Sequence, residues 1–248
     1  MLLVLTFQLF TTLYYWPFYD MSVRGRGPTQ AGVDILPAVF LTVPSSIIVS
    51  VLTSRLGRFR WAIWGGWAVT TLACGLQILL DVNTSTAITS VLLAVLGVGM
   101  GMVLTSVNIG IQAISKPEDA AMAASMYGFL RSLGMPIGVA VSHVSFRPLV
   151  EILTRFKLSG TVFSNSMSGK LSELGLPTAI AHDSERYVLV LHTMEDSLEK
   201  RTILKSYMAG FDSVFIMITA ISASAFLVSF IIRKFSMDKI LLAQFSAR

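Results

Sequence analysis

One arginine of this sequence lies inside a long apolar segment, where a charge is costly. Arg131 falls about eleven residues into the stretch 120–146, near the middle of a bilayer at about 1.5 Å of helix rise per residue. A charged side chain at that depth costs at least about 2.5–3.5 kcal/mol unless a cavity or a protein partner receives it. We therefore expect Arg131 to contact a substrate or take part in proton coupling. A structural arginine bonded to the carbonyls of a neighbouring helix is the alternative.

Several side-chain amides also lie within apolar segments. Asn108 and Gln112 are one helical turn apart, so they share a face. They can line a central cavity or tie two helices together by hydrogen bonds, and the sequence favours neither role. Gln8 and Gln77 are weaker candidates of the same kind.

Asp34 is an acidic residue near the outer end of its apolar segment, 30–54. A carboxylate at the mouth of a membrane protein can exchange protons, so Asp34 is a candidate for a substrate or proton pathway. It also follows Gly32 at a helix start, where the helix dipole stabilises a negative charge, and this structural role is favoured.

A short basic stretch separates two of the apolar segments. Arg55, Arg58 and Arg60 surround Gly57. Positive charges at a helix C-terminus are stabilised by the helix dipole and by the anionic inner leaflet. Gly57 permits a tight turn because it has no Cβ. The stretch therefore predicts a basic turn on the cytosolic side.

Catalytic and metal-binding chemistry is not predicted. The three histidines and the single cysteine are scattered, so no metal or cofactor site is expected. The sequence has no phosphate-binding loop, nucleophile elbow or paired-carboxylate motif. A membrane-embedded enzyme is therefore the least favoured class.

Six long apolar segments position these residues. Each reaches the roughly 20 residues that a helix needs to cross about 30 Å of hydrocarbon. The predicted fold is all-α, a polytopic membrane protein with one membrane domain. Its segments are 1–19, 30–54, 61–80, 87–114, 120–146 and 209–232. The domain is divided into five membrane helices in 1–147, a long loop 148–208, a sixth helix 209–232 and a tail 233–248.

Small residues and one amphipathic stretch predict how some of these segments pack. Glycines repeat at close spacing in the fourth and fifth segments, which predicts close approach of helix backbones; they are Gly97, Gly99, Gly101, Gly134 and Gly138. The amphipathic stretch 193–207 predicts a helix that either lies on the membrane surface or leads into the last segment.

The composition supports a membrane protein and excludes a nucleic-acid partner. Charged residues are 13% of the chain, hydrophobic residues are 54%, and the mean hydropathy is +0.71. The net charge of +5 comes from basic residues spread over loops and tails, without a dense run. The expected partner is the lipid bilayer.

The distribution of basic residues predicts the orientation of the chain. The short loops around 55–60 and 115–119, together with the C-terminal tail, hold most of the basic residues outside the long loop. Short basic loops stay in the cytosol, whereas long loops cross the membrane largely regardless of charge. Both termini are therefore expected in the cytosol and the long loop on the outer side.

The basic turn also carries a resemblance to a known family. The pattern Arg55-x-Gly57-Arg58-x-Arg60 resembles the cytoplasmic loop signature of the major facilitator superfamily. Ser50 and Ser54 stand where that signature has a glycine and an acidic residue. This departure is common in the second half of such transporters, so the resemblance favours a C-terminal half and weakens the gating role of the turn.

Further motifs resemble one branch of that superfamily, the fungal drug:proton antiporters with 14 membrane spans. The similar stretches are Tyr14-Tyr15-Trp16-Pro17, 24–34, Lys116-Pro117-Glu118-Asp119 and 129–134. The order of segments also fits, with a long outer loop before the last one. The resemblance covers nearly the whole chain and implies the last six spans, folded as a half bundle of two three-helix repeats.

The resemblance implies proton-coupled efflux of small amphipathic organic molecules or drugs. The first, second, fourth and fifth segments would line the central cavity, and the turn from Arg55 to Arg60 would be a gating loop. The implied location is the plasma membrane, with the vacuolar membrane as the alternative. An opposing wall would come from a missing N-terminal half or another chain. The alternative function is a truncated, non-transporting remnant or a half that needs a partner chain.

Overall fold

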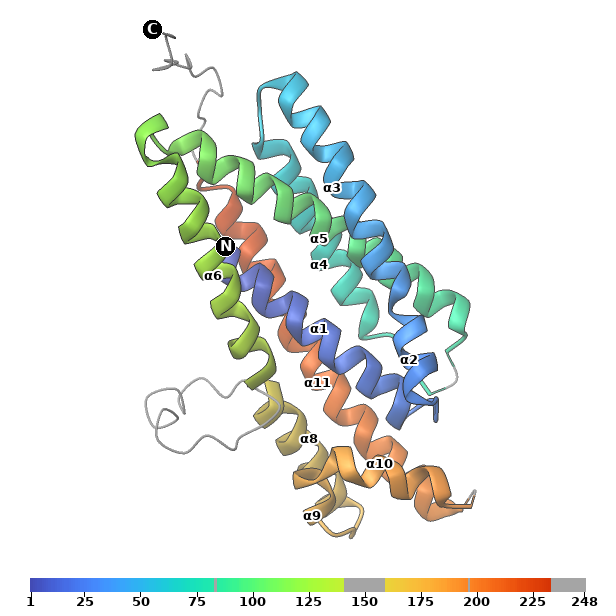
Figure 1. Ribbon diagram of the computed structural model, residues 1–248. Helices are drawn as coiled ribbons and strands as arrows, with labels where there is room; N and C mark the ends of the chain where they lie inside the picture. The colour runs from blue at the N-terminus through green and yellow to red at the C-terminus, as the bar shows by residue number, and fades with distance from the viewer. Residues whose placement is uncertain (83, 141–158, 196, 233–248) are drawn as a thin grey trace, which may run out of the picture.

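The computed structural model describes residues 1–82, 84–140, 159–195 and 197–232, and these residues form helices and no strand (Figure 1). The predicted all-α fold is therefore confirmed. The predicted tail 233–248 and the part of the fifth segment beyond 140 lie outside the described residues. The helices are α1 (Leu2–Ser22), α2 (Pro28–Asp34), α3 (Leu36–Leu56), α4 (Arg60–Gln77), α5 (Thr86–Ile114), a 3₁₀ turn (Pro117–Asp119), α6 (Ala120–Ala140), α8 (Ser159–Glu173), α9 (Ala179–His182), α10 (Ser184–Thr193) and α11 (Leu198–Ser229).

Three helical stretches of the described chain are long and apolar enough to cross a membrane by length and composition. They are Pro28–Leu56, Thr86–Ile114 and Leu198–Ser229. The other three predicted spans are also helical, as α1, α4 and α6. Each of the six apolar segments therefore contains one main helix of the bundle.

Proline and glycine set two of the helix boundaries. Pro37 lacks an N–H, and its ring crowds the carbonyl four residues earlier, so α2 ends at Asp34 and α3 begins at Leu36. Gly57 ends α3 in the left-handed region, at φ 62°, and its N–H donates to the Thr53 carbonyl at 3.0 Å. The predicted tight turn is therefore present, because glycine adopts positive φ without steric cost.

The main helices pack in a pattern that is symmetric between the first three (α1, α3, α4) and the last three (α5, α6, α11). Helix α3 packs on α5, and α6 packs on α1 in the equivalent way. Helix α4 contacts α5, and α11 contacts α1, while α4 and α11 contact each other. The contacts thus fit the predicted half bundle of two three-helix repeats.

Glycines bring the backbones of neighbouring helices into direct contact, as predicted. A Cβ at Gly97 would lie 2.1 Å from the Ala38 carbonyl oxygen of α3. One at Gly134 would lie 1.8 Å from Oγ1 of Thr6 on α1. The α3–α5 contact also gains hydroxyl bonds, because Ser45 Oγ donates to the Val98 carbonyl at 2.9 Å. Small residues and hydroxyls are what holds helices together where water provides no hydrophobic drive.

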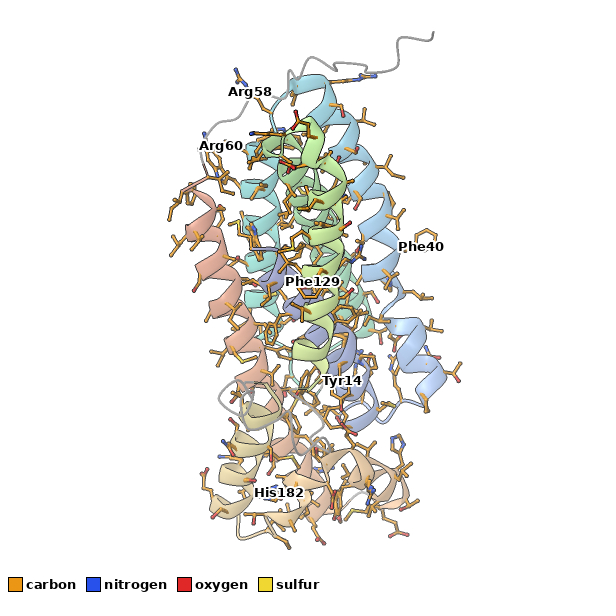
Figure 2. All side chains as sticks on the ribbon, turned by 60° about the vertical axis from the view of Figure 1, so that its left-hand side comes forward. Tyr14, Phe40, Arg58, Arg60, Phe129 and His182 are labelled. Carbon is orange, nitrogen blue, oxygen red and sulfur yellow. The ribbon has the colours of Figure 1, made fainter. Side chains whose placement is uncertain are left out.

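The described part of the predicted long loop is helical and caps one end of the bundle (Figures 1 and 2). Helix α8 packs on α11 through an aromatic cluster, with the Phe163 and Phe211 ring centroids 4.9 Å apart and those of Phe18 and Phe163 5.4 Å apart. Of the amphipathic stretch predicted at 193–207, Thr193 ends α10, and the part from Leu198 begins α11 and leads into the last span. The lower boundary of that span, expected at 209, therefore lies inside the helix.

Candidate functional site

Polar side chains of α5 and α6 gather on one exposed side of the bundle. Asn108 is half-buried and Gln112 is exposed, and Gln112 Nε2 donates to Asn108 Oδ1 at 2.9 Å. The two amides therefore share a face, as predicted from their spacing. Across from them on α6, the Tyr127 hydroxyl donates to the Leu104 carbonyl at 3.5 Å. Arg131 is exposed and lies one turn beyond Tyr127 on α6.

The exposed surface of α6 has two chemically different sides. At 3.6 residues per turn, one side carries small or polar residues and the other carries large apolar ones. The small and polar side holds Ala124, Ser125, Gly128, Arg131 and Ser132. The apolar side holds Met122, Met126, Phe129 and Leu133, all exposed, with Phe129 visible on the outer face in Figure 2. Arg131 therefore lies on the small and polar side of α6 and not on its apolar side.

Arg131 lies beside the contact that α6 makes with α1. Gly134 occupies that contact, and Leu130 packs into the adjacent apolar cluster. Among the described residues, Arg131 forms no ion pair. Its expected role at a central cavity stays a prediction.

The basic turn lies at the end of the bundle opposite the helical cap (Figure 2, Arg58 and His182). Arg55 and Arg58 are exposed, whereas the Arg60 guanidinium lies 4.5 Å from the centre of the Trp64 ring. The neighbouring Phe59 is buried against Gly110 of α5. The turn is therefore anchored to α5 at Gly110, about half a helical turn from both Asn108 and Gln112. Its gating role stays a prediction.

Asp34 does not join these residues. It lies at the capped end of the bundle and forms an ion pair with Arg26. Arg26 Nη2 also donates to the Thr86 hydroxyl at 2.6 Å. The structure thus separates Asp34 from Arg131 and places it in a charged network of its own.

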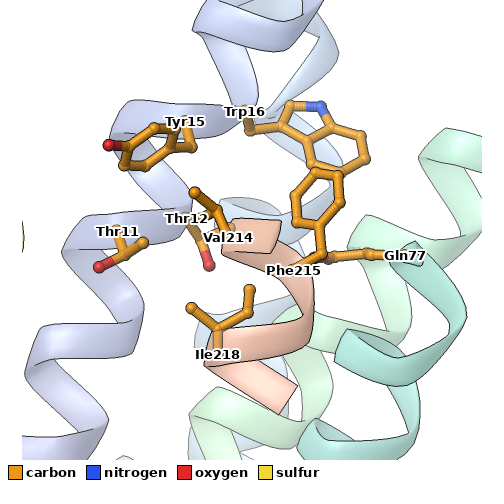
Figure 3. A pocket seen from close by; sticks show the side chains of 8 residues that line it. All are labelled: Thr11, Thr12, Tyr15, Trp16, Gln77, Val214, Phe215 and Ile218. Atoms are coloured by element: carbon orange, nitrogen blue, oxygen red, sulfur yellow. The ribbon is translucent and has the colours of Figure 1, made fainter. Parts of the chain in front are cut away.

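A second polar site lies inside the bundle, between α1, α4 and α11 (Figure 3). Eight residues border a gap that is too narrow to hold a water molecule: Thr11, Thr12, Tyr15, Trp16, Gln77, Val214, Phe215 and Ile218. Gln77 is completely buried, and neither of its amide atoms has a hydrogen-bond partner among the described residues. Burying an amide without hydrogen-bond partners lowers the free energy of unfolding by several kcal/mol. An apolar residue at this position would therefore pack at lower cost than Gln77.

The adjacent turn of the same interface is hydrogen-bonded. Gln8 Nε2 donates to Cys74 Sγ at 2.9 Å, and Ser222 Oγ donates to Gln8 Oε1 at 2.8 Å. Gln8 and Gln77 were predicted from the sequence as candidate polar residues of the bundle interior, but Thr11 and Thr12 were not predicted. The available signal was the spacing of Gln8, Thr12 and Trp16, which repeats every four residues and places them on one face of α1.

Comparison with known proteins defines the class of this bundle. Residues 1–139 match the model of the Major Facilitator Superfamily. The chain belongs to this superfamily of membrane transporters, as the basic turn at Gly57 suggested. No solved structure matches the chain.

Several fungal transporters are similar to nearly the whole chain. It is 31% identical to MFS transporter L2 of Phoma sp., over 93% of the chain and 36% of that protein. It is 30% identical to the MFS efflux transporter aclA of Aspergillus oryzae, over 79% of the chain and 35% of that protein. It is 25% identical to Efflux pump FUS6 of Gibberella fujikuroi, over 100% of the chain and 43% of that protein. The chain therefore spans well under half the length of these relatives.

Proposed function

We propose that this chain is the C-terminal half of a proton-coupled efflux transporter for small amphipathic organic molecules, in the branch with 14 membrane spans. One observation carries the proposal: Arg131, Asn108 and Gln112 give polar and charged surface to α5 and α6 in the middle and inner part of the bundle. Two of the relatives have efflux in their names, which supports the direction of transport.

The argument rests on the cost of placing these groups in lipid. A guanidinium that faced acyl chains would cost at least about 2.5–3.5 kcal/mol, and intramembrane charges in proteins face cavities or partners. The polar side of α6 is therefore the side that a second bundle and a substrate pathway would cover. In transporters built from repeats, the substrate site lies between such bundles near the midplane.

The substrate class follows from the balance of polar and apolar surface. Few polar groups are available beside Arg131, while large exposed apolar residues line α3 and α6, among them Phe40, which is 77% exposed and points away from the bundle in Figure 2. Sites that bind organic molecules are mostly apolar with a few placed polar groups. We expect an amphipathic molecule held mainly by apolar contact.

Reconstitution separates this proposal from a self-sufficient carrier. We expect the 248-residue chain in liposomes with an imposed proton gradient to show no accumulation of fluorescent drug-like substrates. Co-expression with the N-terminal half of a fungal relative should restore gradient-dependent transport, because that half supplies the missing wall. Transport by the chain alone that is lost in Arg131→Ala would contradict the half-transporter proposal. A pair of halves that folds together but does not transport would favour the non-transporting alternative.

Cysteine labelling tests the proposed orientation, with the termini in the cytosol of a plasma-membrane protein. Asn165 on α8 and Arg58 in the basic turn are both exposed, whereas the native Cys74 is buried. In intact cells, an impermeant maleimide should label Asn165→Cys and should label Arg58→Cys only after permeabilisation. The unsubstituted chain is the control and should stay unlabelled. The reverse pattern would overturn the orientation.

A further inference from the structure

One aspartate at the capped end of the bundle is completely buried. Asp20 lies in the last turn of α1, immediately after the predicted first span 1–19, and is 0% exposed. Its Oδ1 accepts a hydrogen bond from Arg24 Nη1 at 3.2 Å, and its Oδ2 has no hydrogen-bond partner in the described part of the chain. Burying a charged oxygen without a hydrogen bond is unfavourable, so Oδ2 is the atom at which a proton would be most stabilising.

The charged groups around Asp20 come from several elements. Arg24 and Arg26 lie in the connection after α1, and Asp34 lies on α2 in an ion pair with Arg26. Other titratable groups near this end include Tyr19 on α1, Asp81 after α4, Asp212 on α11, and Glu185 and His192 on α10, with His192 bonded to the Met21 carbonyl. Helix α6 contacts α1 at Thr6. This contact is about 21 Å from Asp20 along the axis of α1.

These surroundings shift the Asp20 carboxyl toward its neutral form. Burial raises the pKa of the carboxyl, Arg24 and Arg26 oppose this effect, and Asp34 adds to it. The network also connects distant parts of the bundle, because Arg24 Nη2 donates to the Thr84 carbonyl at 2.9 Å, and both arginines reach the Thr86 hydroxyl at the start of α5.

We propose that Asp20 is a proton-binding site of this chain, taking a proton from the outer solution on Oδ2. The assignment deepens the proposed proton-coupled transport and rests on it for its physiological role. When Oδ2 is protonated, the Asp20–Arg24 ion pair becomes a hydrogen bond from a guanidinium to a neutral acid. The formal charge of Asp20, Arg24, Arg26 and Asp34 then changes from zero to one positive, which destabilises the buried cluster.

The consequence is a link between the proton and the two three-helix repeats. Arg24 and Arg26 attach the end of α1 to the start of α5, and these are the first helices of the two repeats. A positive cluster is stabilised by moving its arginines toward water. Protonation of Asp20 therefore weakens the attachment between the repeats at this end of the bundle.

Infrared difference spectroscopy of the purified chain in lipid nanodiscs tests the site without any transport measurement. Lowering the pH from mildly alkaline to mildly acidic should produce the carbonyl stretch of a protonated carboxylic acid. This band should disappear in Asp20→Asn and return, shifted, in Asp20→Glu. A pH-dependent band that is unchanged in Asp20→Asn, or no band at all, would overturn the proposal.

Two further variants keep the test decisive if Asp20→Asn fails to fold. Arg24→Gln removes the cation that opposes protonation, so the band should appear at higher pH. Asp34→Asn removes a neighbouring negative charge, so the band should appear at lower pH. Shifts of the opposite sign, or none, would contradict the assignment.

Separately, a complete transporter that shows no gradient-driven transport would refute the proposed function. The infrared titration of Asp20 would still decide whether this residue binds a proton.

Discussion

Substrate transport by the complete transporter should fall to background when Arg131 is replaced by alanine, while the yield of folded protein stays near that of the wild type. Arg131 is exposed in the isolated bundle and forms no ion pair with the described residues. Its removal therefore leaves no buried partner unsatisfied, and an effect on the free energy of unfolding of within about 0.5 kcal/mol is expected. Losing a hydrogen bond between a charged group and a substrate costs about 1.5–3 kcal/mol, or roughly 10- to 100-fold in transport rate.

The measurement is initial-rate efflux from cells or proteoliposomes, normalised to folded protein and paired with thermal unfolding. Arg131→Lys is the informative variant, because it keeps the charge but loses the planar donor fork, and it should retain partial transport. Arg201→Ala, at an exposed position on α11, is the control and should transport normally. If Arg131→Ala abolishes folding instead of transport, the arginine has the structural role.

The second large effect concerns the stability of the bundle. Gly97→Ala should destabilise it by about 3 kcal/mol or more, because the added Cβ would lie 2.1 Å from the Ala38 carbonyl oxygen and 2.9 Å from its Cα. These are backbone atoms, so no rotamer change relieves the clash and α3 must move away from α5. The hydrogen bond from Thr42 Oγ1 to the Gly97 carbonyl, 3.2 Å long, would then also be strained or lost.

Gly128→Ala is the matched control, because a Cβ at Gly128 on α6 meets no atom within 4 Å. It should stabilise the bundle by about 0.5–1 kcal/mol, because alanine is favoured over glycine inside a helix. Unfolding in mixed micelles, followed by tryptophan fluorescence, compares the two variants directly. Equal stabilities of Gly97→Ala and Gly128→Ala would show that the α3–α5 contact is looser than the structure indicates.

The sequence by itself determined the main helices of the bundle and the class of protein. Apolar length predicts membrane helices because the bilayer thickness sets one requirement for every span, and the Arg55–Arg60 turn with its Gly57 indicated the superfamily. The shared face of Asn108 and Gln112 also followed from local geometry, since residues one turn apart lie together on any α-helix. Each of these conclusions depends on neighbours along the chain, which the sequence displays directly.

Only the tertiary structure decided which residues meet across helices. It separated Asp34 from Arg131 and joined Gln8 to Cys74 and Ser222. It also showed that Asp20 is completely buried, although it looks like an ordinary loop charge in the sequence. Burial and pairing depend on how helices distant in sequence rotate and approach each other. Glycine contacts such as Gly97 with Ala38 fix that arrangement, and no local pattern specifies the partner.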